Sequence, residues 1–429
     1  MEHIPSTQAL QPHDRAEGGT SAPLVIVTML FFMWGLLTSL NDVLIPHLKA
    51  VYTLSYVQAM LVQFCFFGAY FIVSLPAGML IRRIGYQRGV VVGLAGAAVG
   101  CALFYPAAMN GYGLFLLAFF VLAAGITTLQ VAANPYVTVL GDAHTASSRL
   151  TLTQAFNSLG TTIGPALGGL LILSGIMLDD RQLAQLPAQA QVAYRASQAA
   201  MVQQPYLLLA GLLLMLAVIF AVINLPKIAH GDEQATVQGT SSIFAHRHLV
   251  LGVVAIFLYV GGEVSIGSFL INFMEDPNIA SLGQAEAARF VSFYWGGAMV
   301  GRFIGSAAMR HISPGKALAF NGACSMLLIL GAVLGRGHLA MWSILAVGLC
   351  NSIMFPTIFS MALRGLGKLA GQGAGLLCMG IVGGALVPFA QGMVADKLGV
   401  QPSFAVPVLC YAFICYYGWK YRAALVRPS

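Results

Sequence analysis

Charged residues are scarce in this chain: Asp, Glu, Lys and Arg make up only 8% of its 429 residues, whereas apolar residues make up 58%. A water-soluble domain needs about a quarter of its residues charged to cover its surface, so this class is excluded. Apolar stretches recur along nearly the whole chain, and each has the roughly 20 residues needed to cross a bilayer core. The alternating ten-residue pattern of a membrane β-barrel is missing. The sequence therefore predicts an all-α membrane protein.

The sequence also lacks the motifs of cofactor and metal chemistry. Its seven cysteines all fall inside apolar stretches without CxxC spacing, which is typical of packing residues rather than disulfides or metal ligands. No P-loop, glycine-rich nucleotide motif or metal-ligand cluster is present, and no Ser/His/Asp assembly lies within the membrane segments. We therefore expect no cofactor and no enzymatic activity. The basic residues are not gathered on one face or tail, so a nucleic-acid partner is not expected either.

Apolar runs and their breakers predict twelve helices. Residues 1–23 form a polar N-terminal tail without the features of a cleaved signal peptide. Residues 175–203 form an extramembrane segment, and a polar linker at 226–247 separates an N-terminal half (24–225) from a C-terminal half (248–429). The predicted helices are 24–46, 57–80, 89–109, 112–134, 150–174, 204–225, 249–273, 286–309, 317–335, 339–362, 370–394 and 402–420.

The positive-inside rule assigns the orientation, because cytoplasmic loops carry an excess of Lys and Arg. Six of these residues fall on one side, namely Lys49, Arg181, Arg195, Arg289, Arg336 and Lys397. Fourteen fall on the other, namely Arg15, Arg82, Arg83, Arg88, Arg149, Lys227, Arg247, Arg310, Lys316, Arg364, Lys368, Lys420, Arg422 and Arg427. Both termini and the linker are therefore expected in the cytoplasm.

The two halves show an internal repeat. The segment Arg82–Gly89, after the second predicted helix, aligns without a gap with Arg310–Ala317, after the eighth. Asn134-Pro135 corresponds to Phe355-Pro356, and Gly164-Pro165 to Val387-Pro388, in the same order along the chain. The order of these matches predicts two pseudo-symmetric six-helix halves. In rocking transporters of this architecture, the substrate lies at mid-membrane between the halves.

Only three charged residues fall clearly inside predicted helices, and such residues are functional candidates by default because a charge in the bilayer is costly. Asp42 is a candidate for function, with an interfacial cap or a partner to Lys49 as the structural alternatives. Glu263 lies in the middle of its helix beside Gly261 and Gly262, which permit close packing or local unwinding, and it is a candidate for binding a proton or sodium. Arg302, near the cytoplasmic end of its helix, is expected to stabilise the fold.

Amide side chains are unusually frequent within the apolar helices. Each amide offers both donors and acceptors, which suits a neutral polyhydroxylated ligand, although amides also join helices to one another. Aromatic residues (Trp34, Tyr70, Tyr259 and Tyr294) could supply flat faces for sugar C–H groups. The amides in question are Gln63, Gln130, Asn134, Gln154, Asn157 and Asn351.

Several strings resemble the fucose–galactose–glucose:cation symporters of the major facilitator superfamily. They are Leu40–Pro46 (LNDVLIP), Ala132–Gly141 (AANPYVTVLG), Gln154–Ser158 (QAFNS), Gly301–Phe303 (GRF) and Phe355–Ser360 (FPTIFS). The superfamily's loop signature is partly kept in Gly78, Arg82, Arg83, Gly85 and Arg88, but its expected acid is missing.

The resemblance implies a fold of twelve helices and cation-coupled sugar uptake across a bacterial inner membrane. In the L-fucose permease branch, it implies acids at the positions of Asp42 and Gln130, and polar positions matching Ser39, Gln154 and Asn157 that face the sugar. Gln130 cannot titrate, whereas Glu263 stands where that branch has a glutamine, and its string Glu263–Gly267 looks more like the glucose/galactose transporter branch. We infer that the coupling charge has moved from the helix of Gln130 to that of Glu263.

The predicted protein is a monomeric inner-membrane transporter that imports a neutral hexose or related sugar by proton or sodium symport. Uncoupled facilitation, efflux, or a non-transporting sugar sensor are the alternatives. Asp42 and Glu263 are the expected cation-coupling residues. The structural or gating residues are Arg82, Arg83, Arg88, Arg302 and Arg310. The expected sugar-binding residues are Ser39, Asn41, Gln130, Asn134, Gln154, Asn157, Tyr259 and Asn351.

Overall fold

A computed structural model describes residues 21–52, 56–171, 185–223 and 243–422; within these ranges some side chains lie outside the described part, among them those of residues 40–52, 56–60 and 62–63. Within these ranges the chain forms helices and no strand. The α-helices are α1 (Ser21–Tyr52), α2 (Tyr56–Ile84), α3 (Tyr86–Asn110), α4 (Tyr112–Val139), α5 (Ala146–Leu171), α7 (Ala188–Ala200), α8 (Gln203–Val222), α9 (Arg247–Glu275), α10 (Gln284–Ala308), α11 (Pro314–Leu334), α12 (Gly337–Asn351), α13 (Met354–Leu363), α14 (Ala370–Met379), α15 (Gly383–Leu398), α16 (Val400–Ser403) and α17 (Ala405–Lys420). Short 3₁₀ turns are η1 (Ala143–Thr145), η2 (Ile243–Ala245), η3 (Gly367–Leu369) and η4 (Gly380–Val382).

Each of the twelve predicted helices has a counterpart, but three are interrupted. The predicted helix 339–362 is split into α12 and α13, 370–394 into α14 and α15 with η4 between them, and 402–420 into α16 and α17. The end predicted for the first helix at residue 46 is wrong, because α1 continues through Pro46 to Tyr52. Residues 1–20 and 224–242, which include most of the predicted tail and linker, lie outside the described residues.

Nine helical segments of the described chain are long and apolar enough to cross a membrane. The described apolar part of α1, Pro23–Ser39, is shorter than these segments. The helices α5 and α10 contain more polar residues than the nine segments do. These three helices pack within the same bundle: α1 lies against α5, and α5 lies against α10. The fold is therefore an all-α bundle of twelve membrane helices, as the sequence predicts.

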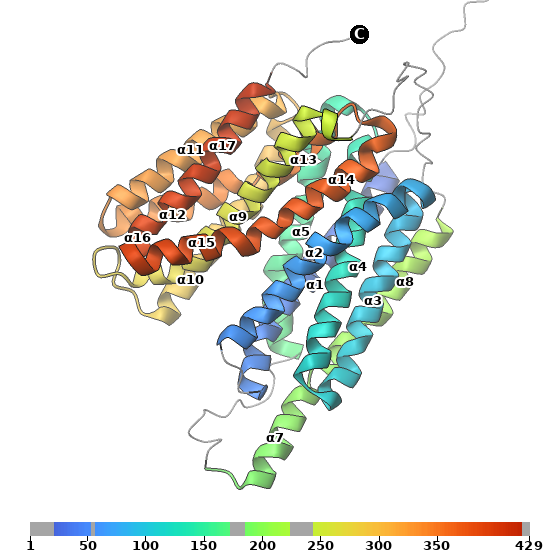
Figure 1. Cartoon of the computed structure of the whole chain (residues 1–429), viewed down its shortest axis with the longest axis vertical. Helices are drawn as coiled ribbons and strands as arrows, with labels where there is room; N and C mark the ends of the chain where they lie inside the picture. Colours follow the sequence, from blue (N-terminus) through green and yellow to red (C-terminus); the bar gives the residue numbers. More distant parts are fainter. Residues whose placement is uncertain (1–20, 53–55, 172–184, 224–242, 423–429) are drawn as a thin grey trace, which may run out of the picture.

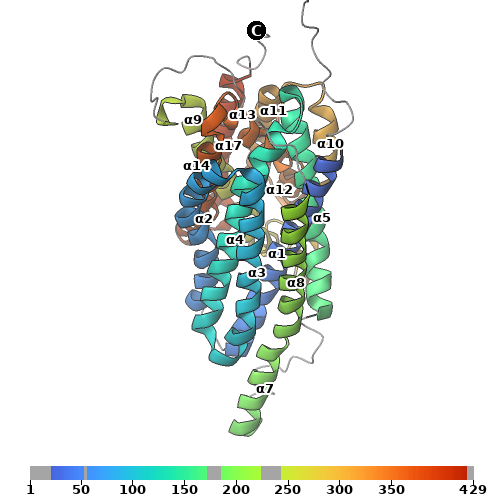
Figure 2. The ribbon, with the colours of Figure 1, turned by 90° about the vertical axis from the view of Figure 1, so that its right-hand side faces the viewer.

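The helices form two groups, α1–α8 and α9–α17, which lie side by side (Figure 1). The final turns of α2, α13 and α17 and the start of α14 lie at the same end of the bundle (Figure 1), and Arg82, Arg364, Lys420 and Arg422 belong to these helix ends. We call this the basic end. The carbonyl oxygen of Arg364 accepts a hydrogen bond from His248 at the start of α9, which places these elements together. At the opposite end, the extra helix α7 projects beyond the bundle (Figures 1 and 2).

Glycines allow the close packing of α9 against α15. A Cβ at Gly261 would lie 2.3 Å from Val387 Cγ2, and a Cβ at Gly383 would lie 2.0 Å from the Phe257 carbonyl oxygen. Neither distance leaves room for a side chain. The structure shows close packing at Gly261 and no unwinding at Gly261 or Gly262, because α9 is continuous from Arg247 to Glu275.

Candidate functional site

The two groups of helices are joined by polar contacts between α5 and α10. The Ser148 hydroxyl lies 2.5 Å from the Ser306 carbonyl oxygen, and the Ser306 hydroxyl donates to the Ser148 carbonyl oxygen at 3.0 Å. Farther from the basic end, Arg302 donates to the Gln154 carbonyl oxygen at 3.4 Å and also contacts the Ser158 hydroxyl. These contacts form what we call the α5–α10 seam, and they close the bundle at its basic end.

A second seam joins α2 to α14 at the same end. A Cβ at Gly375 would lie 2.6 Å from the Ser74 carbonyl oxygen, and a Cβ at Gly78 would lie 2.8 Å from the Gly371 carbonyl oxygen. The backbones approach so closely that only glycine fits at these two positions. Small residues commonly allow such approach between membrane helices. Both seams lie toward the basic end, whereas the far ends of the two groups diverge in the view of Figure 1.

Glu263 is held in a hydrogen-bond network within the second group of helices. Its Oε1 accepts a hydrogen bond of 2.7 Å from the Tyr259 hydroxyl, one turn earlier on α9. Its backbone carbonyl oxygen accepts one of 3.1 Å from the Tyr294 hydroxyl on α10. The Glu263 side chain is partly exposed, whereas Tyr259 and Tyr294 are buried. The carboxylate is thus fixed in direction and open on one side.

Asn351 at the end of α12 joins the phenols of this network. Its Nδ2 donates to the Tyr294 hydroxyl at 2.7 Å, and its Oδ1 accepts from the Tyr411 hydroxyl at 2.7 Å. The Asn351 side chain is fully buried, with both polar atoms paired. Its backbone carbonyl oxygen also lies 3.2 Å from the Tyr259 hydroxyl. Asn351 therefore positions Tyr259, Tyr294 and Tyr411 around the carboxylate.

The break between α12 and α13 supplies backbone acceptors at mid-membrane. Pro356 has no N–H, so the carbonyl oxygen of Ser352, four residues earlier, has no partner within the helix. Arg302 Nε donates to this oxygen at 3.3 Å. Arg302 thus contacts the broken helix in one group and α5 in the other. No ion pair joins Arg302 to Glu263 among the described side chains.

The buried amides of α4 and α5 have atoms without partners. Gln130 Nε2 donates to the Tyr70 hydroxyl, but Gln130 Oε1 has no partner. Neither polar side-chain atom of Asn134 is paired, and Gln154 Nε2 is likewise unpaired. Buried polar groups are normally hydrogen-bonded, and unpaired ones mark places where water or a ligand supplies the partner. These three amides therefore differ from Asn351, whose two side-chain polar atoms both have hydrogen-bond partners.

Other predicted binding residues hold α1 against α5. Asn157 Nδ2 donates to the Phe31 carbonyl oxygen at 2.9 Å, and the Ser39 hydroxyl donates to the Thr161 carbonyl oxygen at 2.9 Å. Asn157 remains partly exposed, and Ser39 is buried. The side chains of Asn41, Asp42 and Gln63 lie outside the described residues, although the backbone of α1 passes through positions 41 and 42.

The predicted gating arginines fall into two groups. Four of them are exposed at the basic end: Arg82 and Arg83 in the last turn of α2, Arg88 in the first turn of α3, and Arg310 just after α10. Arg302 lies deeper, on the α5–α10 seam. The sequence analysis missed Tyr411, Ser158, Ser148 and Ser306, because single hydroxyl groups in apolar helices give no pattern that separates network members from packing residues. No group of three potential metal-ligating side chains occurs in the described ranges.

A bundle of membrane helices in two groups, closed at one end and with a partly exposed carboxylate, Glu263, midway along a membrane helix, is typical of a membrane transporter rather than an enzyme. A model of the Major Facilitator Superfamily matches residues 26–388. The chain is 55% identical over 416 residues to the glucose/galactose transporter of Brucella abortus, covering 97% of this chain and 98% of that protein. It is 33% identical over 422 residues to the L-fucose-proton symporter of Escherichia coli, covering 95% of each.

The solved structures include a similar fold. The crystal structure of FucP, a transporter of the same superfamily in the outward conformation, has a TM-score of 0.87 and 32% sequence identity to this chain. The match covers 94% of this chain and 99% of FucP. The chain belongs to the Major Facilitator Superfamily, and the resemblance to its fucose–galactose–glucose symporters is confirmed.

Proposed function

We propose that this chain is a secondary active transporter that imports a neutral hexose or related sugar together with a cation, by alternating access of its two groups of helices. The names of its relatives support the sugar class: the Brucella protein is a glucose/galactose transporter, and the Escherichia coli protein is an L-fucose-proton symporter. The coupling ion is a proton or sodium. Either ion would bind to a carboxylate, so the coupling mechanism depends on which carboxylate binds the ion.

The observation on which the coupling proposal depends is the environment of Glu263. Its carboxylate is partly exposed, is oriented by the Tyr259 hydroxyl, and has no ion-pair partner among the described side chains. A permanently paired carboxylate would be unavailable to a cation, whereas this one retains Oε2 for a proton or a sodium ion. Ionisable groups at this depth are costly and are retained for function. Asp42, on α1, is proposed as the second acid.

The proposed sugar site uses the amide groups that lack partners. Gln130, Asn134 and Gln154 retain unpaired donors or acceptors, and each would gain a partner from a sugar hydroxyl. Asn157, Ser39 and Asn41 are proposed along the same side of the first group. Tyr259 and Asn351 act on the other side by orienting the carboxylate, because Asn351 already has both side-chain atoms paired.

We further propose that the basic end faces the cytoplasm of a bacterium, with both termini and the linker there, and that the chain works as a monomer in the inner membrane. The excess of Lys and Arg at this end supports that orientation. The structure would then be an outward-facing state, closed on the cytoplasmic side by the two seams. The similarity to FucP in the outward conformation supports this assignment.

The test is uptake of radiolabelled hexose into liposomes that contain the purified protein. A pH gradient and a sodium gradient are imposed separately, and a panel of neutral hexoses and L-fucose is compared. We expect accumulation above the outside concentration with one of the two gradients. Sugar uptake that merely equilibrates under both gradients would show a facilitator and refute symport.

A further inference from the structure

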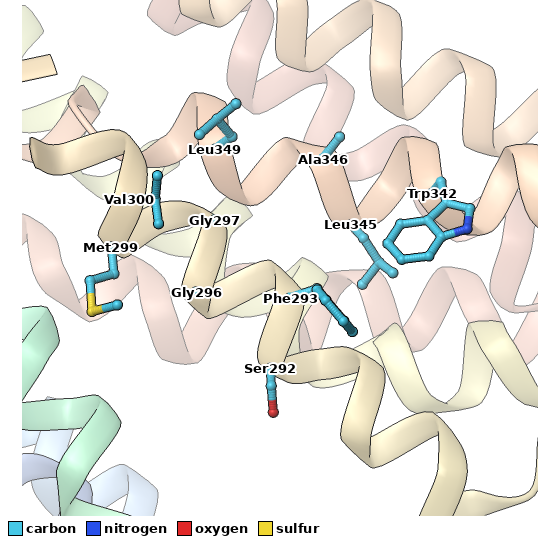
Figure 3. Close-up of a pocket in the computed structure, with 10 residues that line it drawn as sticks. All are labelled: Ser292, Phe293, Gly296, Gly297, Met299, Val300, Trp342, Leu345, Ala346 and Leu349. Atoms are coloured by element: carbon cyan, nitrogen blue, oxygen red, sulfur yellow. The ribbon is translucent and has the colours of Figure 1, made fainter. Parts of the chain in front are cut away.

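A groove runs along the outer surface of the second group of helices, between α10 and α12. It has a volume of about 440 Å³, and its walls are apolar. Phe293, Gly296 and Val300 line it from α10, and Trp342, Ala346 and Leu349 line it from α12 (Figure 3). None of these residues takes part in the network around Glu263, so the groove is separate from the proposed transport site.

Small residues create the groove, and aromatic rings bound it. A Cβ at Gly296 would meet no atom within 4 Å, so the space above this glycine is open. Ala346 faces the same space from α12. The rings of Phe293 on α10 and Trp342 on α12 meet edge to face, with centroids 5.6 Å apart at an interplanar angle of 72°, and they bridge the two sides of the groove.

The groove faces away from the interior of the bundle. Phe293 is 57% exposed, Val300 49% and Leu349 47%, values that are typical of side chains directed toward the surrounding lipid in this fold. The stripe of α10 that contacts α5 contains Met299, Arg302 and Ser306, and it lies on the neighbouring side of the same helix. In a membrane, the groove is therefore filled by acyl chains.

Two polar residues precede the lining residues on α10 and α12, toward the end opposite the basic end. Arg289 lies one turn before Phe293 on the exposed stripe of α10, and His338 lies one turn before Trp342 on α12. Both residues are exposed. A helix rises about 1.5 Å per residue, so the stripe from Arg289 to Val300 is about 16 Å long, roughly half of a 30 Å hydrocarbon core.

We propose that this groove is a specific binding site for one anionic phospholipid. One acyl chain lies between α10 and α12, over Gly296 and Ala346. The phosphate is held by the guanidinium of Arg289, with the imidazole of His338 as a second donor. The geometry suits a lipid because the cation stands at the membrane surface and the apolar groove runs from it to the bilayer centre. This proposal requires only that the chain spans a membrane and is independent of the proposed sugar transport.

Trp342 provides a direct reporter, because its ring lines the groove. The protein is reconstituted with phospholipids that have brominated acyl chains, which quench tryptophan fluorescence on contact. Brominated phosphatidylglycerol is compared with brominated phosphatidylcholine at equal mole fraction. The contribution of Trp342 is obtained by subtracting the signal of Trp342→Phe, in which the other three tryptophans remain.

We expect phosphatidylglycerol to occupy the site about fivefold more strongly than phosphatidylcholine, because an arginine near anionic lipid is worth about 1 kcal/mol. Arg289→Gln should abolish this preference, and Arg289→Lys should retain most of it. Gly296→Leu should reduce the quenching of Trp342 by both lipids, because leucine fills the groove. Gly211→Leu, at an exposed glycine of α8 with equal space, is the matched control and should change nothing.

Equal quenching by the two lipids in the unmodified protein would refute the proposal and show ordinary lipid contact. A preference for phosphatidylglycerol that survives Arg289→Gln would also overturn it, because the charge would then act elsewhere. Strong quenching that persists in Gly296→Leu would show that the acyl chain lies outside the groove.

Discussion

Substitution of Glu263 by glutamine isolates the effect of its charge. Glutamine has the same shape and retains Oε1 as an acceptor, so the Tyr259 hydroxyl can still donate to it as it does at 2.7 Å in the structure. The bonds of Asn351 to Tyr294 and Tyr411 do not involve the carboxylate and should remain. The variant should therefore fold and bind sugar, while losing a group that can take up a proton or coordinate sodium.

The expected size of the effect follows from the energy in the ion gradient. A tenfold gradient of one coupled ion stores about 1.4 kcal/mol, which supports about tenfold accumulation of sugar at equilibrium. Without coupling, the ratio of internal to external sugar is about one, whatever the gradient. We therefore expect Glu263→Gln to lose the whole tenfold accumulation and to keep exchange of labelled for unlabelled sugar across the membrane.

The assay measures both quantities in the same liposomes. Gradient-driven accumulation is compared with sugar exchange when no gradient is present. Glu286→Gln, an identical change at an exposed acid in the first turn of α10, is the matched control and should accumulate sugar normally. If Glu263→Gln accumulates sugar as well as the unmodified protein does, the reasoning is refuted and the coupling charge lies elsewhere, with Asp42 as the first position to test.

Two further predictions concern the seams at the basic end. Arg302→Gln removes a charged hydrogen-bond donor from the α5–α10 seam. Hydrogen bonds to charged groups are worth about 1.5–3 kcal/mol. The equilibrium between the closed and the open basic end should therefore shift at least about tenfold toward the open form. Electron-resonance distances between spin labels at exposed positions 144 and 311 should then broaden toward longer values, and an unchanged distribution would contradict the role of Arg302. Gly375→Ala should destabilise the α2–α14 seam by about 1–3 kcal/mol through overpacking. Gly68→Ala on α2, where a Cβ meets no atom within 4 Å, should leave the melting temperature unchanged, and equal effects of the two variants would contradict the packing argument.

The sequence predicted the number and approximate position of the membrane helices because hydrophobic length is a local property. It placed Glu263 at mid-helix for the same reason. It did not predict the interruption between α12 and α13, since Pro356 alone does not reveal whether a membrane helix kinks or stops. The break depends on neighbouring residues that bond to the freed carbonyl oxygens. Arg302 donates to the Ser352 oxygen, and the Tyr259 hydroxyl lies within hydrogen-bond distance of the Asn351 oxygen.

The sequence could not assign the amides to separate roles. Asn351 and Asn134 are both amides within apolar helices, and composition does not distinguish them. In the structure, Asn351 has both side-chain atoms paired with tyrosine hydroxyl groups, whereas neither atom of Asn134 is paired. The pairing of Asn351 depends on residues from two other helices, Tyr294 of α10 and Tyr411 of α17. Long-range packing of this kind has no signature in a single sequence.

The interrupted helix provides a physical link between the proposed ion site and the closed seam. The carbonyl oxygens of Asn351 and Ser352 are adjacent in the chain: the first lies 3.2 Å from the Tyr259 hydroxyl that orients Glu263, and the second accepts a hydrogen bond from Arg302. Arg302 in turn reaches Gln154 on α5. Under the proposed mechanism, a cation bound at Glu263 would neutralise its carboxylate, and Arg302, which bonds to both the broken helix and α5, joins the two groups of helices. Symport requires that cation and sugar together favour a state that neither favours alone. We propose that Arg302, which bonds to both the broken helix and the seam, carries this coupling by changing its contacts when the basic end opens.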